Sequence, residues 1–193
     1  MPFEEHYPAW RQALAGGGWR GSGEELPAAA AAWLLHQGSL TEKLRGRCGS
    51  LKVRIVRQGW FSGSLKTNEA SFCAAKTDAA GLPAVETAQT GGVAAAAPER
   101  VWLREVVLFG DGVPWVFAQT LLPGSGARGT AAGLTELGDE PIGPWLFARR
   151  TRRQSLQWRR DEGGLYARRS MLLLEGSPLQ ISELFLPQFD FAG

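Results

Sequence analysis

The sequence predicts an α+β domain built on an antiparallel β-sheet, with helices packed on one side of the sheet. Segments that alternate apolar and polar residues outnumber the helical segments, and short turns join them, which is typical of antiparallel strands. Two helical segments precede the first strand, so helices and strands do not alternate along the chain. The length of 193 residues, 44% of them hydrophobic, suits one domain with a sizeable core.

The predicted domain covers residues 24–193. Residues 1–23 include the glycine-rich stretch AGGGWRGSG, which predicts a flexible or loosely packed N-terminal arm. Residues 70–98 consist mostly of Ala, Gly, Thr and Pro, with few large apolar side chains. We interpret this segment as a long variable loop and assign it no chemistry.

Two helices are expected before the first strand. The first begins near Pro27, whose fixed φ suits a first helical turn, and runs through an alanine-rich stretch to Gly38. The second spans about residues 39–45, because Ser39 and Glu42 form an S-x-x-E capping box.

Strands account for most of the remaining elements. Residues 51–58 alternate as a half-buried strand does, and residues 101–120 predict a hairpin whose turn is GDGVP. A short helix is expected over residues 130–137. Residues 154–160 and 168–187 predict three further strands, the last two joined by an EGSP turn.

Two charged residues stand out because strand alternation places them among apolar neighbours. Arg104 shares one face of its strand with three apolar residues, and Glu105 lies on the other face, so whichever face is buried buries a charge. Glu183 likewise shares its face with three apolar residues. An unpaired buried ion costs several kcal/mol and therefore needs a partner or a ligand.

Two interpretations of Arg104 and Glu183 are open from the pattern alone. They form a structural ion pair across the sheet or lie on an exposed edge. Alternatively, they line a ligand cavity between sheet and helices, where Arg104 clamps an anion and Glu183 is a hydrogen-bonding or proton-transfer group.

Composition excludes several other classes. The net charge of +2 is too small to indicate a nucleic-acid partner. The two cysteines, Cys48 and Cys73, lack C-x-x-C spacing, and neither His6 nor His36 lies in a pattern typical of metal ligands. These observations argue against a structural zinc site and against disulfides, and they favour a reducing compartment.

We expect no membrane span and a cytoplasmic protein. The longest apolar stretch, PAAAAAWLL, is far shorter than the roughly 20 residues that span a bilayer. The N-terminus carries acidic residues where an export signal needs a basic flank.

Three collinear motifs resemble the chorismate pyruvate-lyase family. WLREVVLFGDGVPWVFAQTLLP is similar to the W-L-R-E-(hydrophobic)-G-x-P-W segment of that family, and PIGPWLF and GGLYARRSMLLLEGSPLQISELFLP follow in the order the family uses. The similarity covers about residues 33–187 and is strongest from Val101 onward. Several motifs with compatible spacing are more specific than any one of them.

The resemblance implies a fold and an activity. The family has an antiparallel sheet whose ligand is buried in an internal cavity beneath helical flaps. Its enzymes remove pyruvate from chorismate to give 4-hydroxybenzoate, the first committed step towards ubiquinone. No cofactor and no metal are implied, because aromatisation of the ring drives the reaction. Family precedent also favours a monomer.

The resemblance also assigns site residues by position. The arginine of W-L-R-E grips the ring carboxylate and falls on Arg104, and the glutamate of E-L-F-L-P meets the ring hydroxyl and falls on Glu183. The apolar residue of the P-(L/I)-G turn, which lies against the ring, falls on Ile142. A methionine that helps to cover the site corresponds to Leu40. The segment at 70–98 is longer than the connection usual in the family.

Chorismate carries a second carboxylate, on its enolpyruvyl group, which a site should meet with another cation or amide-lined region. Each candidate arginine is also explained as a solvated end of a strand or helix. Arg168 stands out because it opens the strand that pairs with the one holding Glu183. The candidates are Arg149, Arg150, Arg152, Arg153, Arg159, Arg160, Arg168 and Arg169.

Three alternatives to this activity stay open. A small aromatic-acid sensing domain of the same fold would bind without turnover, and we expect such a domain to accompany a DNA-binding reader. A related lyase would give 3-hydroxybenzoate. An arginine-rich RNA-binding surface would show steep salt dependence of RNA affinity.

Overall fold

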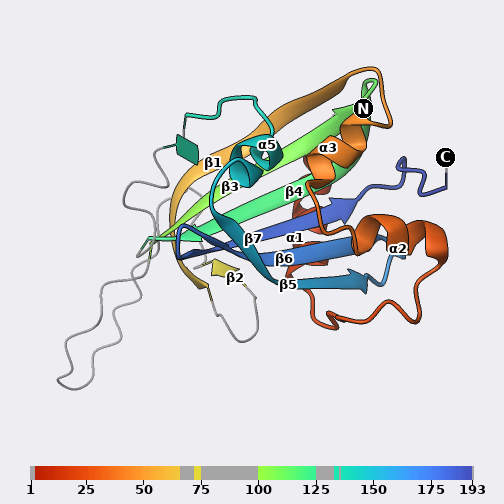
Figure 1. Ribbon diagram of the computed structural model, residues 1–193, viewed down its shortest axis with the longest axis horizontal. Coiled ribbons are helices and arrows are strands. Elements are labelled where there is room, and N and C mark those ends of the chain that lie inside the picture. The colour runs from red at the N-terminus through yellow and green to blue at the C-terminus, as the bar shows by residue number, and fades with distance from the viewer. Residues whose placement is uncertain (1–2, 66–71, 75–99, 125–132, 135, 193) are drawn as a thin grey trace.

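A seven-stranded antiparallel sheet of order β2-β1-β3-β4-β7-β6-β5 forms the centre of the protein (Figure 1). The computed structural model describes residues 3–65, 72–74, 100–124, 133–134 and 136–192. The strands are β1 (Leu51–Leu65), β2 (Phe72–Ala74), β3 (Arg100–Gly110), β4 (Val113–Pro123), β5 (Thr151–Arg160), β6 (Tyr166–Leu174) and β7 (Ser177–Phe185). The α+β class and the antiparallel sheet are therefore confirmed.

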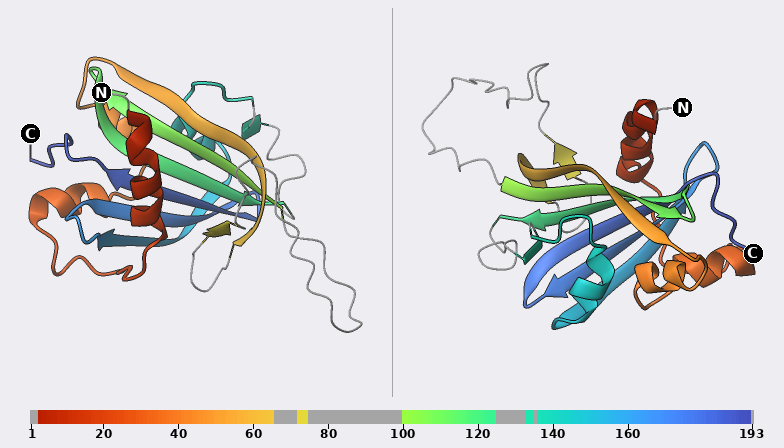
Figure 2. Two further views of the ribbon diagram at one scale, coloured as in Figure 1. Left: turned by 180° about the vertical axis from the view of Figure 1, so that it is seen from behind. Right: turned by 90° about the horizontal axis from the view of Figure 1, so that it is seen from above.

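Helices lie against both faces of this sheet, as Figure 2 shows. The front face, which carries Val106, Ala118 and Phe185, is covered by α2 (Ala28–Leu34), α3 (Leu40–Arg45) and α5 (Ile142–Phe147). The back face, which carries Phe117 and Leu184, is covered by α1 (Tyr7–Ala15), which follows the short 3-10 helix η1 (Phe3–His6). The expectation that helices occupy one side alone is thus wrong for α1.

The N-terminal arm expected at residues 1–23 is also corrected over its described part. Trp10 and Leu14 of α1 are buried, and the Trp10 ring lies 5.5 Å from the Phe117 ring of β4. The glycines that suggested an arm begin only at Gly16, which caps the C-terminal end of α1. Apolar packing therefore orders this helix before the glycine-rich stretch begins.

The local signals for helices and turns were accurate. The side chain of Ser39 accepts a hydrogen bond from the backbone N–H of Glu42, as the capping box predicts. The hairpin of β3 and β4 turns at Asp111 and Gly112, which have φ values of 48° and 83°. Asp111 also accepts hydrogen bonds from the backbone N–H groups of Gly49 and Ser50, so its carboxylate ties the residues just before β1 to this turn.

The described strands contain three register shifts, and two of them change the face to which an arginine points. In β1 the register shifts between Ile55 and Arg57, so Ile55 joins the front face and Arg57 joins the back face. In β5 it shifts between Arg153 and Ser155, which places Arg153 on the front face. Simple alternation would have placed Arg57 on the front face and Arg153 on the back face.

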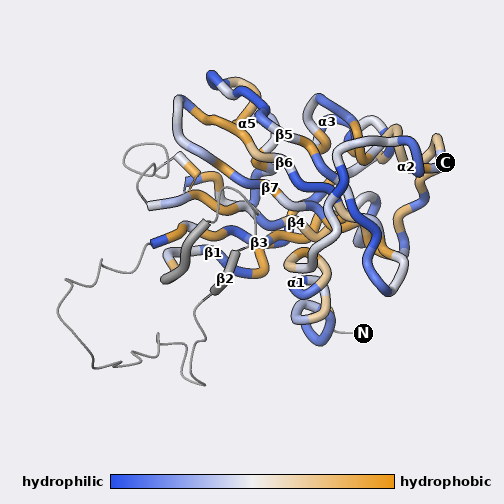
Figure 3. Tube along the Cα trace, turned by 90° about the horizontal axis from the view of Figure 1, so that it is seen from below, coloured by the Kyte–Doolittle hydropathy of each residue, from blue (hydrophilic) through white to orange (hydrophobic). Residues whose placement is uncertain are grey.

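Two predicted segments fall mainly outside the described residues. Of the loop expected at 70–98, the structure describes only β2, which pairs with Gly63–Leu65 of β1. Half of the helix expected at 130–137 also lies outside them, and Gly133 and Leu134 in the described half are helical. Hydrophobic residues follow the central strands in Figure 3. Within the described ranges, no helix has both the length and the apolar character needed to cross a bilayer.

Candidate functional site

Arg104 and Glu183 point to the same face of the sheet, beneath α2, α3 and α5. Arg104 pairs with Thr120, while the next front-face row runs from Val106 through Ala118 to Glu183. Two strand spacings across the sheet and one two-residue step along it separate their Cα atoms by about 12 Å. This separation is compatible with the predicted ligand cavity between the two side chains.

Arg104 is a buried cation with an unused donor. Its side chain rises from the middle of β3, and the residue is 2% exposed. Nη2 donates to the carbonyl oxygens of Gly138 at 2.9 Å and Glu140 at 2.8 Å. Nη1 is buried and makes no hydrogen bond within the described part of the chain. Burial lowers the pKa of Arg104, and the charge of Asp139 offsets part of this shift.

Glu183 forms an ion pair, and its partner is Arg168. The two residues are register partners on β7 and β6, and Arg168 Nε lies 2.5 Å from Glu183 Oε2. Arg168 Nη1 also donates to the carbonyl oxygens of Trp33 and His36, each at 3.1 Å. A structural pair across the sheet therefore exists, but it joins Glu183 to Arg168 and leaves Arg104 outside it.

Leu40 and Ile142 begin the two helices that cover this part of the front face. The helices α3 and α5 touch at their N-terminal ends, where an added Cβ on Gly143 would lie 2.5 Å from Ser39 Oγ and 2.7 Å from Thr41 Oγ1. Leu40 packs in the cluster that includes Val106 and Ala118. Ile142 packs against the neighbouring cluster and follows the loop that Arg104 binds.

A small accessible area remains under these helices. Val106, Ala118, Ile181 and Glu183 are each 8–9% exposed, although they lie in the central strands, while Phe117 beside them on the back face has none. This residual exposure adjoins Arg104, and the predicted cavity would lie there. The cavity itself stays a prediction.

Sequence reasoning did not identify Ser170 as a site residue. Ser170 pairs with Ile181, one front-face step along β6 from Arg168, and it is 2% exposed. Its hydroxyl is buried with no hydrogen-bond partner among the described residues. Alternation along β6 places Ser170 on the same face as Glu183, and this pattern is the feature of the sequence from which Ser170 could have been predicted as a site residue.

Arg153 joins the front face through the bulge in β5. Its Nη1 donates to the carbonyl oxygens of Gln37 at 2.6 Å and His36 at 3.3 Å, so its guanidinium meets that of Arg168 at the end of α2. Its Nε is buried without a hydrogen-bond partner in the described ranges. Burial lowers the pKa of Arg153, Arg168 lowers it further, and Glu183 opposes the shift.

Glu105 is explained by structure on the back face. It is fully buried, and its carboxylate accepts hydrogen bonds from Arg11 of α1, Arg57 of β1 and Gln119 of β4 at 2.7–3.1 Å. Burial alone would raise the pKa of Glu105, but the bonds from Arg11 and Arg57 outweigh it, and the pKa is lowered. Glu105 thus joins elements of the back face, whereas the neighbouring Arg104 belongs to the candidate site on the front face.

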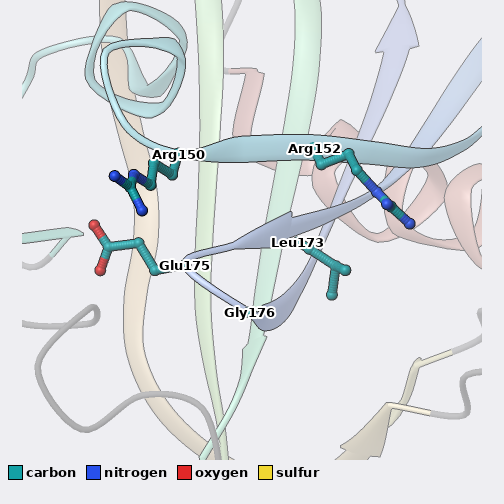
Figure 4. A pocket seen from close by; sticks show the side chains of 5 residues that line it. All are labelled: Arg150, Arg152, Leu173, Glu175 and Gly176. Carbon is teal, nitrogen blue, oxygen red and sulfur yellow. The ribbon is translucent and has the colours of Figure 1, made fainter.

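A separate open hollow of about 630 Å³ lies at the turn between β6 and β7. Figure 4 shows Arg150 and Glu175 turned toward each other there, with Arg152 directed away from them. Neither Arg104 nor Glu183 lines this hollow. We assign it no part in the site.

Two comparisons of the sequence with known proteins agree on one family. The sequence model of the family described as Chorismate lyase matches residues 18–191. Chorismate pyruvate-lyase from Sodalis glossinidius is 38% identical over 82% of this chain and 78% of its own length. Chorismate pyruvate-lyase from Pectobacterium atrosepticum is 35% identical over 84% of this chain and 80% of its own length.

Among solved structures, the effector domain of PhnF from Mycobacterium smegmatis aligns over 80% of this chain and 93% of that chain, with 15% identity and a TM-score of 0.46. The family match spans nearly all of the described strands and helices, including Leu40, Arg104, Ile142 and Glu183. The chain therefore belongs to the chorismate lyase family and is an enzyme of the lyase class.

Proposed function

We propose that this enzyme converts chorismate to 4-hydroxybenzoate and pyruvate, with 4-hydroxybenzoate serving ubiquinone synthesis. The observation that carries the proposal is the buried Nη1 of Arg104, which has no hydrogen-bond partner among the described residues and lies on the sheet face that also presents Glu183. An arginine donor without an acceptor in a buried site is costly, and a ligand carboxylate would supply the missing acceptor.

The substrate's ring would lie between the two side chains. Arg104 binds the ring carboxylate, and Glu183 meets the hydroxyl on the opposite side of the ring. Leu40 and Ile142 supply apolar cover from α3 and α5, which suits a flat ring. These roles follow the family assignment and are consistent with the front-face positions of Arg104 and Glu183.

The reaction requires one C–O cleavage and a proton transfer, without a change of net oxidation state. The bond between the ring carbon and the ether oxygen breaks, and its electron pair leaves with enolpyruvate. The neighbouring, hydroxyl-bearing carbon loses its proton, so the ring becomes aromatic. Enolpyruvate takes up a proton and becomes pyruvate. Glu183, beside the hydroxyl-bearing carbon, is the group placed to handle the ring proton.

The test is to incubate purified protein with chorismate and to separate the products by chromatography. We expect 4-hydroxybenzoate and pyruvate in equal amounts, well above the spontaneous background. A product pool of 3-hydroxybenzoate would mean the related lyase. Binding of 4-hydroxybenzoate without any turnover would mean a sensing domain, and either result would end the proposal.

An Arg104→Ala variant links the activity to the site. It should lose most turnover, while Arg100→Ala, at the exposed start of the same strand, should retain it. Equal activity in the two variants would contradict the assignment of Arg104.

A further inference from the structure

The front face holds more unpartnered donors than one ring carboxylate needs. Arg104 Nη1, Ser170 Oγ and Arg153 Nε are all buried, and none makes a hydrogen bond within the described residues. They come from β3, β6 and β5, which lie in that order across the sheet with Glu183 on β7 between the first and second. Arg104 serves the ring carboxylate in the proposed function, so Ser170 Oγ and Arg153 Nε still lack an acceptor among the described residues.

Charge around these two donors is unbalanced. Arg168 and Arg153 converge on the carbonyl oxygen of His36, at 3.1 and 3.3 Å, and Glu183 is the acidic side chain that pairs with Arg168. Lys43 is also near enough to Arg168 that their repulsion contributes, after burial, to lowering the pKa of Lys43. The same cations, after burial, also lower the pKa of His36, which lies among them. Two guanidinium groups thus share one carboxylate, and a second anion would be stabilised there.

We propose that Ser170 and Arg153 form a second carboxylate subsite, which binds the enolpyruvyl carboxylate of the substrate beside Glu183. The inference rests on the proposed function, since it takes the ring to lie between Arg104 and Glu183. The enolpyruvyl ether leaves the ring at the carbon next to the hydroxyl-bearing carbon, so its carboxylate falls a few bonds from Glu183. Ser170 is a diagonal neighbour of Glu183 across the β6–β7 pair, at about 7–8 Å between Cα atoms.

The subsite distinguishes substrate from product. Chorismate has the second carboxylate and 4-hydroxybenzoate lacks it, so contacts at Ser170 and Arg153 strengthen only the binding of chorismate. Once the C–O bond breaks, the same contacts hold the departing enolpyruvate rather than the aromatic product. A residue that merely holds the fold together would affect both ligands alike.

The experiment measures KM for chorismate and Kd for 4-hydroxybenzoate in Ser170→Ala and Arg153→Gln. Each variant should raise KM about tenfold or more, the loss expected for one charge-assisted hydrogen bond, and leave Kd unchanged. Ser170→Ala removes a hydroxyl that makes no hydrogen bond within the part of the chain that the structure describes, so the thermal stability of the variant should match that of the wild type. Arg152→Gln, the exposed neighbour of Arg153 on β5, is the matched control and should change neither constant.

Two results would overturn the subsite. One is an unchanged KM in Ser170→Ala. The other is an equal rise of KM and Kd in Arg153→Gln, which would show that Arg153 only fastens the end of α2. If the wild type itself forms no 4-hydroxybenzoate, the proposed function fails. In that case direct binding of chorismate to the wild type and to Ser170→Ala still tests the subsite, and equal affinities would refute it.

Discussion

Arg168 and Glu183 face each other as register partners on β6 and β7, with 2.5 Å between Arg168 Nε and Glu183 Oε2. The side chains are 3% and 11% exposed, so water screens this pair little. Arg168 also binds the carbonyl oxygens at the end of α2. The carboxylate of Glu183 in the candidate site is therefore linked through one guanidinium to the end of α2.

Replacing Glu183 with Gln should separate chemistry from binding. The amide keeps the shape but cannot exchange the proton, so kcat should fall by about 10²- to 10⁴-fold. Affinity for 4-hydroxybenzoate should change much less. Steady-state kinetics and calorimetry measure the two effects, and Glu162→Gln, an exposed residue in the β5–β6 turn, is the control. A full-rate Gln variant would remove Glu183 from proton transfer.

Replacing Arg104 with Ala should weaken binding of 4-hydroxybenzoate by about 1.5–3 kcal/mol, because the charged hydrogen bond to the ring carboxylate is lost. The neutral analogue 4-hydroxybenzamide has no carboxylate, so its affinity should be nearly the same for wild type and variant. Calorimetric titration of both ligands into both proteins checks this. If the acid and the amide lose affinity equally, Arg104 does not clamp the carboxylate.

Replacing Glu105 with Gln should destabilise the protein by about 3 kcal/mol, because the buried anion that joins α1, β1 and β4 is removed. The folded-state pKa of Glu105 is lowered from its usual value of 4.5, so the unfolded chain takes up the proton first as the pH falls. The stability that Glu105 contributes is thus complete above that value and is lost as the pH drops through the folded-state pKa.

Urea unfolding between pH 3 and pH 7 measures this contribution. The difference in unfolding free energy between wild type and Glu105→Gln should narrow towards the acid end. A constant or widening difference would mean that the carboxylate does not stabilise the back face. Turnover by the folded variant should stay close to wild type, because Glu105 points away from the site.

Replacing Gly143 with Ala should disturb the cover of the site. The added Cβ would meet Ser39 Oγ at 2.5 Å and Thr41 Oγ1 at 2.7 Å, so α3 and α5 must move apart. We expect weaker 4-hydroxybenzoate binding and a loss of stability of about 1–3 kcal/mol. The exposed Gly163→Ala in the β5–β6 turn is the control. Wild-type affinity in Gly143→Ala would show that the contact of α3 with α5 does not shape the site.

Replacing Trp10 with Ala tests whether α1 belongs to the core. Trp10 is 7% exposed and packs on Phe117 of β4. Truncating a buried Trp should cost about 3–5 kcal/mol, which thermal or urea unfolding measures. A change within about 0.5 kcal/mol is typical of an exposed residue, and it would restore the view of residues 1–23 as a loose arm.

Local patterns predicted the strands and caps because their causes are local. The capping box at Ser39 and the hairpin turn at Asp111 depend on residues within a few positions of each other. Alternation also placed Arg104 and Glu183 correctly on apolar faces. The resemblance implied that both side chains meet one buried ligand, and the strand order and register place them on the same side of the sheet.

Long-range contacts explain what the sequence did not predict. The partner of Glu183 became visible only in the register of β6 against β7. Bulges in β1 and β5 turn Arg57 and Arg153 to faces that strict alternation denies them. The sequence predicted a flexible or loosely packed arm over residues 1–23, because α1 is short and its order depends on packing against strands about a hundred residues away.

Arg104 and Glu105 are consecutive, and their opposite charges leave β3 in opposite directions. If β3 paired with its neighbours one residue out of step, Glu105 would enter the ligand side and Arg104 would meet Arg11 and Arg57. Like charges would then be forced together at a position where the side chain of Glu105 is now fully buried. The Arg–Glu dipeptide thereby penalises misaligned sheets during folding, before any substrate is present.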